Sequence, residues 1–104
     1  MTTIDTSKAS KVLPQDDGSQ IVLIERLAAA QSVPDEDVEN NIYRVSSGGD
    51  VLWQLRAGTG VYPRSPFTGI YWAEDGSLTG YRWDGTEHAI DLKTGIATLL
   101  RLAK

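Results

Sequence analysis

The amino-acid sequence predicts an all-β fold, in which six to eight antiparallel strands form a meander arranged as a small sandwich or a half-open barrel. Three observations lead to this prediction. Short runs rich in β-branched and aromatic residues recur along the chain, most clearly from residue 40 onward. Brief glycine-containing turns, such as Asp75-Gly76 and Asp84-Gly85, separate most of these runs. The sequence also offers no amphipathic helix long enough to cover a sheet.

The length and composition are those of one globular unit. The chain has 104 residues, of which 40% are hydrophobic and 23% are charged, so it is large enough to bury one core. We expect residues 1–10, which are polar and rich in Thr and Ser, to form a flexible N-terminal tail. Residues 11–104 are then expected to form a single β domain.

The first forty residues carry the weaker structural signals. Val12 and Leu13 are expected to form a short strand that the following proline ends, because proline cannot donate a ladder hydrogen bond. Residues 21–27 are ambiguous, since β-branched residues at the start favour a strand and the alanines that follow favour a helix. We expect a strand here, with or without a short helical turn at the alanines, and a solvated loop over residues 31–39.

The remainder of the chain predicts a succession of hairpins. Glycine turns separate its hydrophobic runs, and residues 57–66, with two Gly and two Pro, indicate one long irregular loop. The expected strands span residues 41–45, 51–56, 67–73, 78–83, 86–91 and 96–102.

The two Asp-Gly turns also predict a register. If Asp84 and Gly85 alone form a two-residue turn, Arg82 lies opposite Glu87, and the opposite charges stabilise that pair. The same rule at Asp75-Gly76 yields a predicted core face that consists of Ile70, Trp72, Tyr81, Trp83, His88 and Ile90. The opposite face then carries Tyr71, Ala73, Leu78, Ala89 and the Arg82–Glu87 pair. Because that second face is half apolar, we expect the N-terminal strand, the first hairpin or a second subunit to cover part of it.

Residues suited to catalysis or metal binding are sparse. The absence of cysteine excludes thiolate zinc sites and cysteine nucleophiles. His88 is the only histidine, and we expect it to be a hydrogen-bonded residue of the core, with an enzyme built on His88 as an alternative. Asp91 is expected to cap the turn that ends at Gly95. We therefore predict no catalytic residue, no metal site and no cofactor.

The most suggestive set of residues for binding is aromatic and basic. It comprises Tyr43, Arg44, Trp53, Arg56, Tyr62, Arg64, Tyr71 and Arg82. Such side chains dominate protein interfaces and also stack on bases and hold phosphates, although the aromatic ones equally suit a core and the arginines a solvated face. We predict a non-catalytic interaction module that binds a protein partner or itself through the uncovered sheet face and the loop at residues 57–66. The predicted contact residues are Tyr62, Arg64, Tyr71, Leu78 and Arg82.

The charge distribution bears on the kind of partner. The net charge is −4, and residues 1–40 carry eight acids against three bases. This balance disfavours nucleic acid, so a small nucleic-acid-binding β-barrel is kept as the alternative function. The longest apolar run, residues 21–24, is too short to span a membrane, and no signal peptide is recognisable. We expect a cytoplasmic protein without a membrane partner.

The sequence also resembles known proteins over roughly residues 21–96. The phrases Asn41-Ile42-Tyr43, Trp53-Gln54, Asp75-Gly76-x-Leu78, Trp83-Asp84-Gly85 and Ile90-Asp91-x-x-Thr94-Gly95 carry the resemblance. They are similar to a pattern shared by short, uncharacterised bacterial all-β proteins. The last phrase also looks like the outer hairpin of a β-propeller repeat. The resemblance implies a fold, and it offers no site residues.

Overall fold

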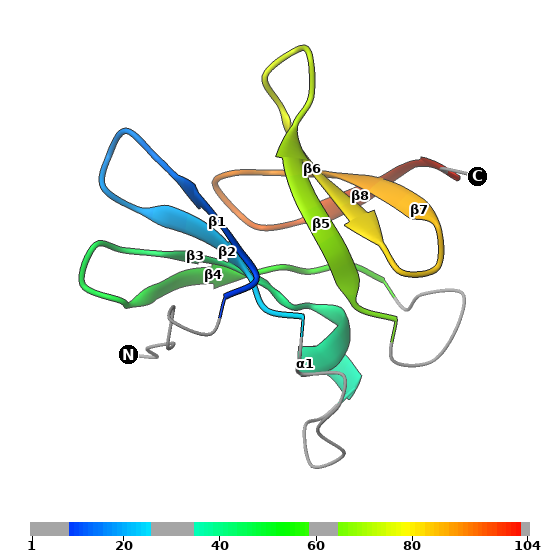
Figure 1. Ribbon diagram of the computed structural model, residues 1–104, viewed down its shortest axis with the longest axis horizontal. Coiled ribbons are helices and arrows are strands. Elements are labelled where there is room, and N and C mark those ends of the chain that lie inside the picture. Colours follow the sequence, from blue (N-terminus) through cyan, green and yellow to red (C-terminus); the bar gives the residue numbers. More distant parts are fainter. Residues whose placement is uncertain (1–8, 26–34, 59–64, 103–104) are drawn as a thin grey trace.

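The computed structural model describes residues 9–25, 35–58 and 65–102, which form two four-stranded antiparallel sheets (Figure 1). The N-terminal sheet contains β1 (Lys11–Pro14), β2 (Gln20–Leu23), β3 (Ile42–Val45) and β4 (Val51–Gln54), paired in that order. The C-terminal sheet contains β5 (Phe67–Trp72), β6 (Leu78–Arg82), β7 (Thr86–Ile90) and β8 (Ala97–Leu102), also in sequence order. Each sheet is a meander, and the sheets do not close into a barrel. The predicted all-β fold class is confirmed.

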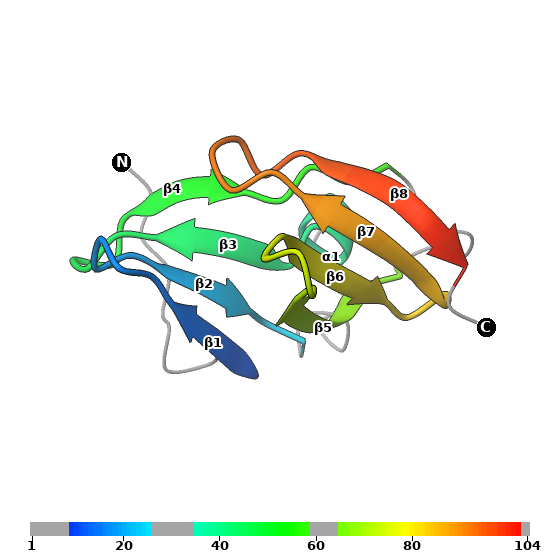
Figure 2. The ribbon, with the colours of Figure 1, turned by 90° about the horizontal axis from the view of Figure 1, so that it is seen from above.

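The two sheets are joined near the start of β8. The Arg56 N–H donates to the Gly95 carbonyl (2.8 Å), and the Ala97 N–H donates to the Arg56 carbonyl (3.0 Å). These bonds form a short parallel bridge between Arg56 and Ile96. The turn between β7 and β8 consequently lies against β4 (Figure 2). Strands β2 and β5 form a second contact between the sheets.

The hydrophobic core lies between the sheets and draws on both. The N-terminal sheet and the residue after β4 contribute Ile21, Leu23, Ile42, Trp53 and Leu55. The C-terminal sheet contributes Phe67, Ile70, Leu78 and Ile90. The outer face of the N-terminal sheet is also buried, with Val22 and Val45 at 0% exposure beside Ile24 and Tyr43.

Asn41 connects the two sheets through hydrogen bonds inside this core. Its side-chain amide donates to the carbonyls of Ile24 (3.0 Å) and Phe67 (2.9 Å). Its side-chain oxygen accepts a bond from the Phe67 N–H (2.9 Å). Because buried backbone groups need partners, this one side chain satisfies main-chain atoms where β2 ends and β5 begins.

Three of the hairpin turns share one construction, which the β6–β7 turn illustrates. Three residues separate β6 from β7, and the third of them, Gly85, has a φ of 87°. The carboxylate of Asp84 accepts bonds from the backbone N–H and the hydroxyl of Thr86. Asp17-Gly18-Ser19 and Asp75-Gly76-Ser77 repeat this Asp-Gly-Ser/Thr pattern, with the same two bonds to the aspartate and a positive φ at the glycine. This is the geometry of a three-residue hairpin loop with glycine in the left-handed conformation.

The longer turns shift the register, so the prediction that Arg82 lies opposite Glu87 is wrong. Glu87 is opposite Tyr81, and His88 is opposite Gly80. On the other side of β6, Ile70 is opposite Gly80 instead of Tyr81. The pairing of β6 is shifted by one residue relative to the prediction, both with β5 and with β7. A shift of one residue exchanges the two faces of a strand.

The faces of β5 and β7 are therefore as predicted, and those of β6 are reversed. Trp72, at the end of β5, is expected in the core but is 41% exposed. Leu78 and Arg82 point into the core at 1% exposure each, whereas Tyr81 lies on the opposite face. Trp83 leaves the predicted core altogether, because it sits in the turn and is 57% exposed.

A short helix replaces part of the predicted loop over residues 31–39. Helix α1 (Asp35–Glu39) forms because Val38 is fully buried and because the Asn40 N–H donates to the Glu36 carbonyl (2.9 Å). The predicted strand at residues 21–27 is confirmed only as β2, and its end and the following alanines lie outside the described residues. Most of the predicted N-terminal tail, residues 1–8, also lies outside them.

Candidate functional site

The side chain of Arg82 is bonded to other segments of the same chain. Its guanidinium donates to the carbonyls of Ser65 (2.9 Å) and Gly58 (2.7 Å) and to the carboxylate of Glu39 (2.9 Å). It also lies 5.1 Å from the centre of the Phe67 ring, within cation–π range. Burial lowers the pKa of Arg82, and the adjacent Glu39 carboxylate opposes that shift. Arg82 thus holds α1 and the segment before β5 against the C-terminal sheet.

His88 is part of a hydrogen-bonded chain in the core. Its Nε2 lies 2.9 Å from the Thr86 hydroxyl, which donates its own proton to Asp84 (2.6 Å). Since a carboxylate only accepts, the Thr86 oxygen accepts from Nε2–H of His88. Burial and the charge of Arg82 lower the pKa of His88, which favours the neutral ring. In this arrangement His88 donates to Thr86, so it does not act as a base toward that hydroxyl.

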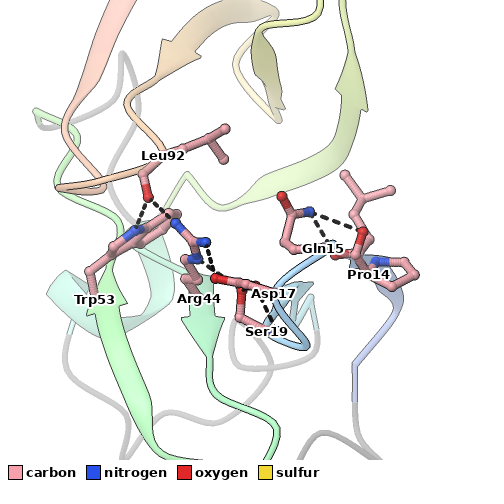
Figure 3. Close-up of polar contacts among 8 residues, drawn as sticks. Pro14, Gln15, Asp17, Ser19, Arg44, Trp53 and Leu92 are labelled. Atoms are coloured by element: carbon pink, nitrogen blue, oxygen red, sulfur yellow. Dashed lines mark hydrogen bonds and ion pairs between the residues drawn. The ribbon is translucent and has the colours of Figure 1, made fainter.

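Arg44 and Trp53 connect the N-terminal sheet to the β7–β8 turn (Figure 3). Both donate to the Leu92 carbonyl, at 2.7 Å from Arg44 Nη1 and 2.7 Å from Trp53 Nε1. Arg44 also forms an ion pair with Asp17 (2.9 Å). Hydrogen bonds from Ser19, assisted by the charge of Arg44, lower the pKa of Asp17. The Asp91 carboxylate accepts from the N–H of Lys93, as expected of the residue that caps this turn.

The structure separates the residues predicted to form one binding face. Tyr71 is 37% exposed on the side of the C-terminal sheet that faces away from the core. Leu78 and Arg82 are buried on the opposite side. Tyr62 and Arg64 lie outside the described residues, as does most of the loop at residues 57–66. Of the wider aromatic and basic set, Tyr43 and Trp53 are also buried.

The outer face of the C-terminal sheet forms the candidate site. It is defined by the residues whose cross-strand pairing places them beside Tyr71. These are Gly69, Tyr71, Thr79, Tyr81, Glu87, Ala89 and Thr98, with Leu100 at the bulge in β8. In contrast to the buried outer face of the N-terminal sheet, this face carries Tyr71 at 37% and Leu100 at 55% exposure.

A hollow of about 500 Å³ lies on this outer face. It is lined by Tyr71, Ala73, Glu74, Thr79, Glu87 and Leu100. Sequence reasoning missed Glu74, Thr79 and Leu100 as candidates. The register error moved Thr79 to the core side, and the bulge that places Leu100 here leaves no mark in the alternation of the sequence.

A second hollow of about 430 Å³ lies between α1, β4 and the β7–β8 turn. Its rim mixes the acid Glu36 with the bases Arg56 and Lys93. Since both signs of charge are present, this hollow favours no single class of ligand.

Two further searches cover the described parts of the chain. Within residues 9–25, 35–58 and 65–102, no three His, Asp or Glu side chains are grouped as a metal site requires. No helix in these segments is long and apolar enough to cross a bilayer.

Comparison with known proteins adds one assignment. A search of curated proteins and a search of solved structures each give no match. A family model, described as Domain of unknown function (DUF7957), matches residues 6–101. That match covers most of the chain, so this protein belongs to the DUF7957 family.

Proposed function

We propose that this protein is a non-catalytic interaction module, which binds a protein partner or a second copy of itself through the outer face of the C-terminal sheet. The observation that carries the proposal is the contrast between the two outer faces. Val22, Tyr43 and Val45 on the N-terminal sheet are at most 9% exposed, whereas Tyr71 and Leu100 on the C-terminal sheet are open. Exposed apolar side chains that adjoin one another commonly mark an interface.

The distribution of the other exposed side chains supports the same sheet. Among the described residues, eight large hydrophobic side chains are exposed, and six of them belong to the C-terminal sheet or its turns. Of these six, Tyr71 and Leu100 lie on the outer face, Trp83 and Ile96 lie between strands, and Trp72 and Leu99 pair with residues of the core side. Tyrosine and tryptophan are also the residues most enriched at the centres of protein interfaces.

The alternative functions have less support. Binding of nucleic acid needs clustered accessible cations, but Arg82 is buried and Arg44 is bound to Asp17 and to the Leu92 carbonyl. The exposed Arg56 shares its hollow with the acid Glu36. An enzyme based on His88 would need an accessible base there, but the ring is buried and its Nε2 is bonded to the Thr86 hydroxyl.

Substitution of Tyr71 tests the proposal. Tyr71→Glu should weaken association by about 2 kcal/mol or more, roughly thirtyfold in affinity, because it removes a central aromatic anchor. Leu52→Glu is the matched control, since Leu52 is 53% exposed on β4 and the substitution adds the same charge. Sedimentation over a hundredfold concentration range measures self-association, and cross-linking in lysate measures partner capture.

The expected result is association that Tyr71→Glu reduces and Leu52→Glu leaves intact. A monomer at every concentration, combined with cross-links that both variants retain equally, would contradict the proposal. Melting temperatures of both variants establish that they are folded.

A further inference from the structure

Thr79 occupies an unusual position in the hollow on the outer face. It lies on the central strand β6 and is 2% exposed, between Tyr71 on β5 and Ala89 on β7. Its hydroxyl oxygen is buried and has no hydrogen-bond partner. A buried hydroxyl without a partner is costly and is uncommon in folded proteins, so it indicates a group that an additional molecule satisfies.

Beside Tyr71, whose hydroxyl both donates and accepts, the other side chains around the hollow are carboxylates or apolar groups. Glu74 at the rim is exposed, and Glu87 is 7% exposed with interactions of its own and with Arg101 as its partner in register. No Lys, Arg or His is among the described side chains that line the hollow. Glu74 and Thr79 are therefore the groups that a ligand in the hollow would meet, with Glu87 as an additional negative charge.

We propose that this hollow binds the cationic side chain of a lysine or arginine that a partner protein presents to the outer face. The carboxylate of Glu74 accepts from the cationic head, and the Thr79 hydroxyl accepts a second bond. Tyr71 lines the same hollow, and Ala73 and Leu100 pack against the aliphatic stem. This inference rests on the proposed function and specifies that the partner presents a basic side chain.

Two features of the molecule fit such a ligand. Residues 65–102, which contain this sheet, carry five acids against three bases, and this local excess of acids favours a basic partner. The Thr79 oxygen is almost completely covered, so contact with a ligand requires the side chain of Thr79 or the ring of Tyr71 to rotate.

The test uses capped tetra-arginine as the probe and tetra-citrulline, its neutral isostere, as the comparison. Amide chemical shifts of the isotope-labelled full chain are recorded while each peptide is added at low salt. The expected result is that tetra-arginine shifts the signals of Ala73, Thr79 and Glu87 and that tetra-citrulline leaves them in place. Shifts of equal size from both peptides would overturn the proposal.

Two variants separate this site from general attraction to an acidic protein. Glu74→Gln should weaken tetra-arginine binding roughly twofold to fivefold, as is typical of one exposed ion pair. Glu36→Gln, at an exposed position on α1, removes the same charge and should have a smaller effect. Equal losses in the two variants would mean that the peptide responds to net charge alone, and the site would be rejected.

Thr79→Val provides an independent measurement. It replaces the hydroxyl with a methyl group of similar shape, so binding should weaken while the melting temperature is unchanged or higher. If instead the melting temperature falls and binding is unchanged, an ordered water satisfies Thr79, and the hollow loses the feature that marks it as a site. If the unsubstituted protein does not bind tetra-arginine while its Tyr71-dependent association is intact, this inference alone is contradicted and the proposed function stands.

Discussion

The guanidinium group of Arg82 joins three segments that are far apart in the sequence. Its partners are Glu39 at the end of α1, Gly58 after β4 and Ser65 before β5. The side chains of Arg82 and Glu39 are 2% and 12% exposed, so both charges are largely withdrawn from water. Removal of one partner from such a pair leaves the other charge buried without compensation.

Arg82→Met should therefore destabilise the protein by about 3–5 kcal/mol. Urea denaturation followed by tryptophan fluorescence measures the change. Arg56→Met is the matched control, because Arg56 is exposed and surface substitutions usually cost less than about 0.5 kcal/mol. Similar losses in the two variants would contradict a structural role for Arg82.

His88 should make stability depend on pH. Its pKa in the folded protein is below the ordinary value of 6.5, because of burial and the nearby charge of Arg82. The unfolded chain then binds a proton at a higher pH than the folded protein does. The contribution of neutral His88 to the free energy of unfolding is fully present above about pH 6.5. It decreases as the pH falls from there toward the folded pKa.

His88→Gln should flatten this dependence between pH 7 and pH 5. At pH 7 it should change stability by about 1–2 kcal/mol, since it alters packing against Phe67 and the bond to Thr86. Denaturation curves at a series of pH values test both effects. An unchanged slope in the variant would show that other groups cause the dependence. Asp17 and Asp75 act separately, because their lowered pKa values affect stability only below about pH 3.8.

At the scale of elements, the β7–β8 turn depends on one close contact. Gly95 has a φ of 77°, and a Cβ placed there would lie 2.5 Å from the Trp53 ring. Trp53 also donates to Leu92 in the same turn. The turn therefore packs directly on the indole, and Gly95 serves both the backbone conformation and the close approach.

Gly95→Ala should be more destabilising than Gly76→Ala. Both glycines have positive φ, which costs an alanine about 1–2 kcal/mol, but nothing lies within 4 Å of a Cβ at Gly76. The contact with Trp53 should add about 1–3 kcal/mol for Gly95. Thermal unfolding of the two variants measures the difference. Equal losses would show that the indole moves aside freely.

Element positions could be predicted from the sequence far better than their faces. The strands from residue 41 onward lie within a residue or two of their predicted bounds, because turn glycines and β-branched runs mark them locally. The register could not be predicted from Asp-Gly alone, since that dipeptide suits both a two-residue and a three-residue loop. The serine or threonine that follows each Asp-Gly was the available signal, because its hydroxyl and N–H bond the aspartate.

The sequence pattern that resembles other proteins has mainly structural roles in this chain. Asn41 bonds to backbone groups of both sheets, Trp53 bonds to the Leu92 carbonyl, and the Gln54 amide donates to the Asn40 carbonyl. Asp75 and Asp91 accept bonds within their turns. This explains why the pattern predicts a fold and contains no site.

At the scale of the whole molecule, the two sheets are covered unequally. The sequence indicated correctly that one side of the C-terminal sheet is partly apolar and open, and it identified Tyr71 there. It could not place Leu78 or Arg82, because burial of Arg82 depends on Glu39, which is 43 residues away in the chain. Long-range pairs of this kind are set by the packing of the sheets and leave no local signal.

The three-residue turns also restrict how this family can vary in length. A hairpin loop that gains or loses two residues keeps each strand residue on its original side of the sheet, whereas a change of one residue reverses the sides. Such a reversal in β6 would carry Arg82 out of the core and Tyr81 into it. Natural insertions and deletions between β5 and β7 should therefore occur in even numbers, a pattern that any two aligned relatives can reveal.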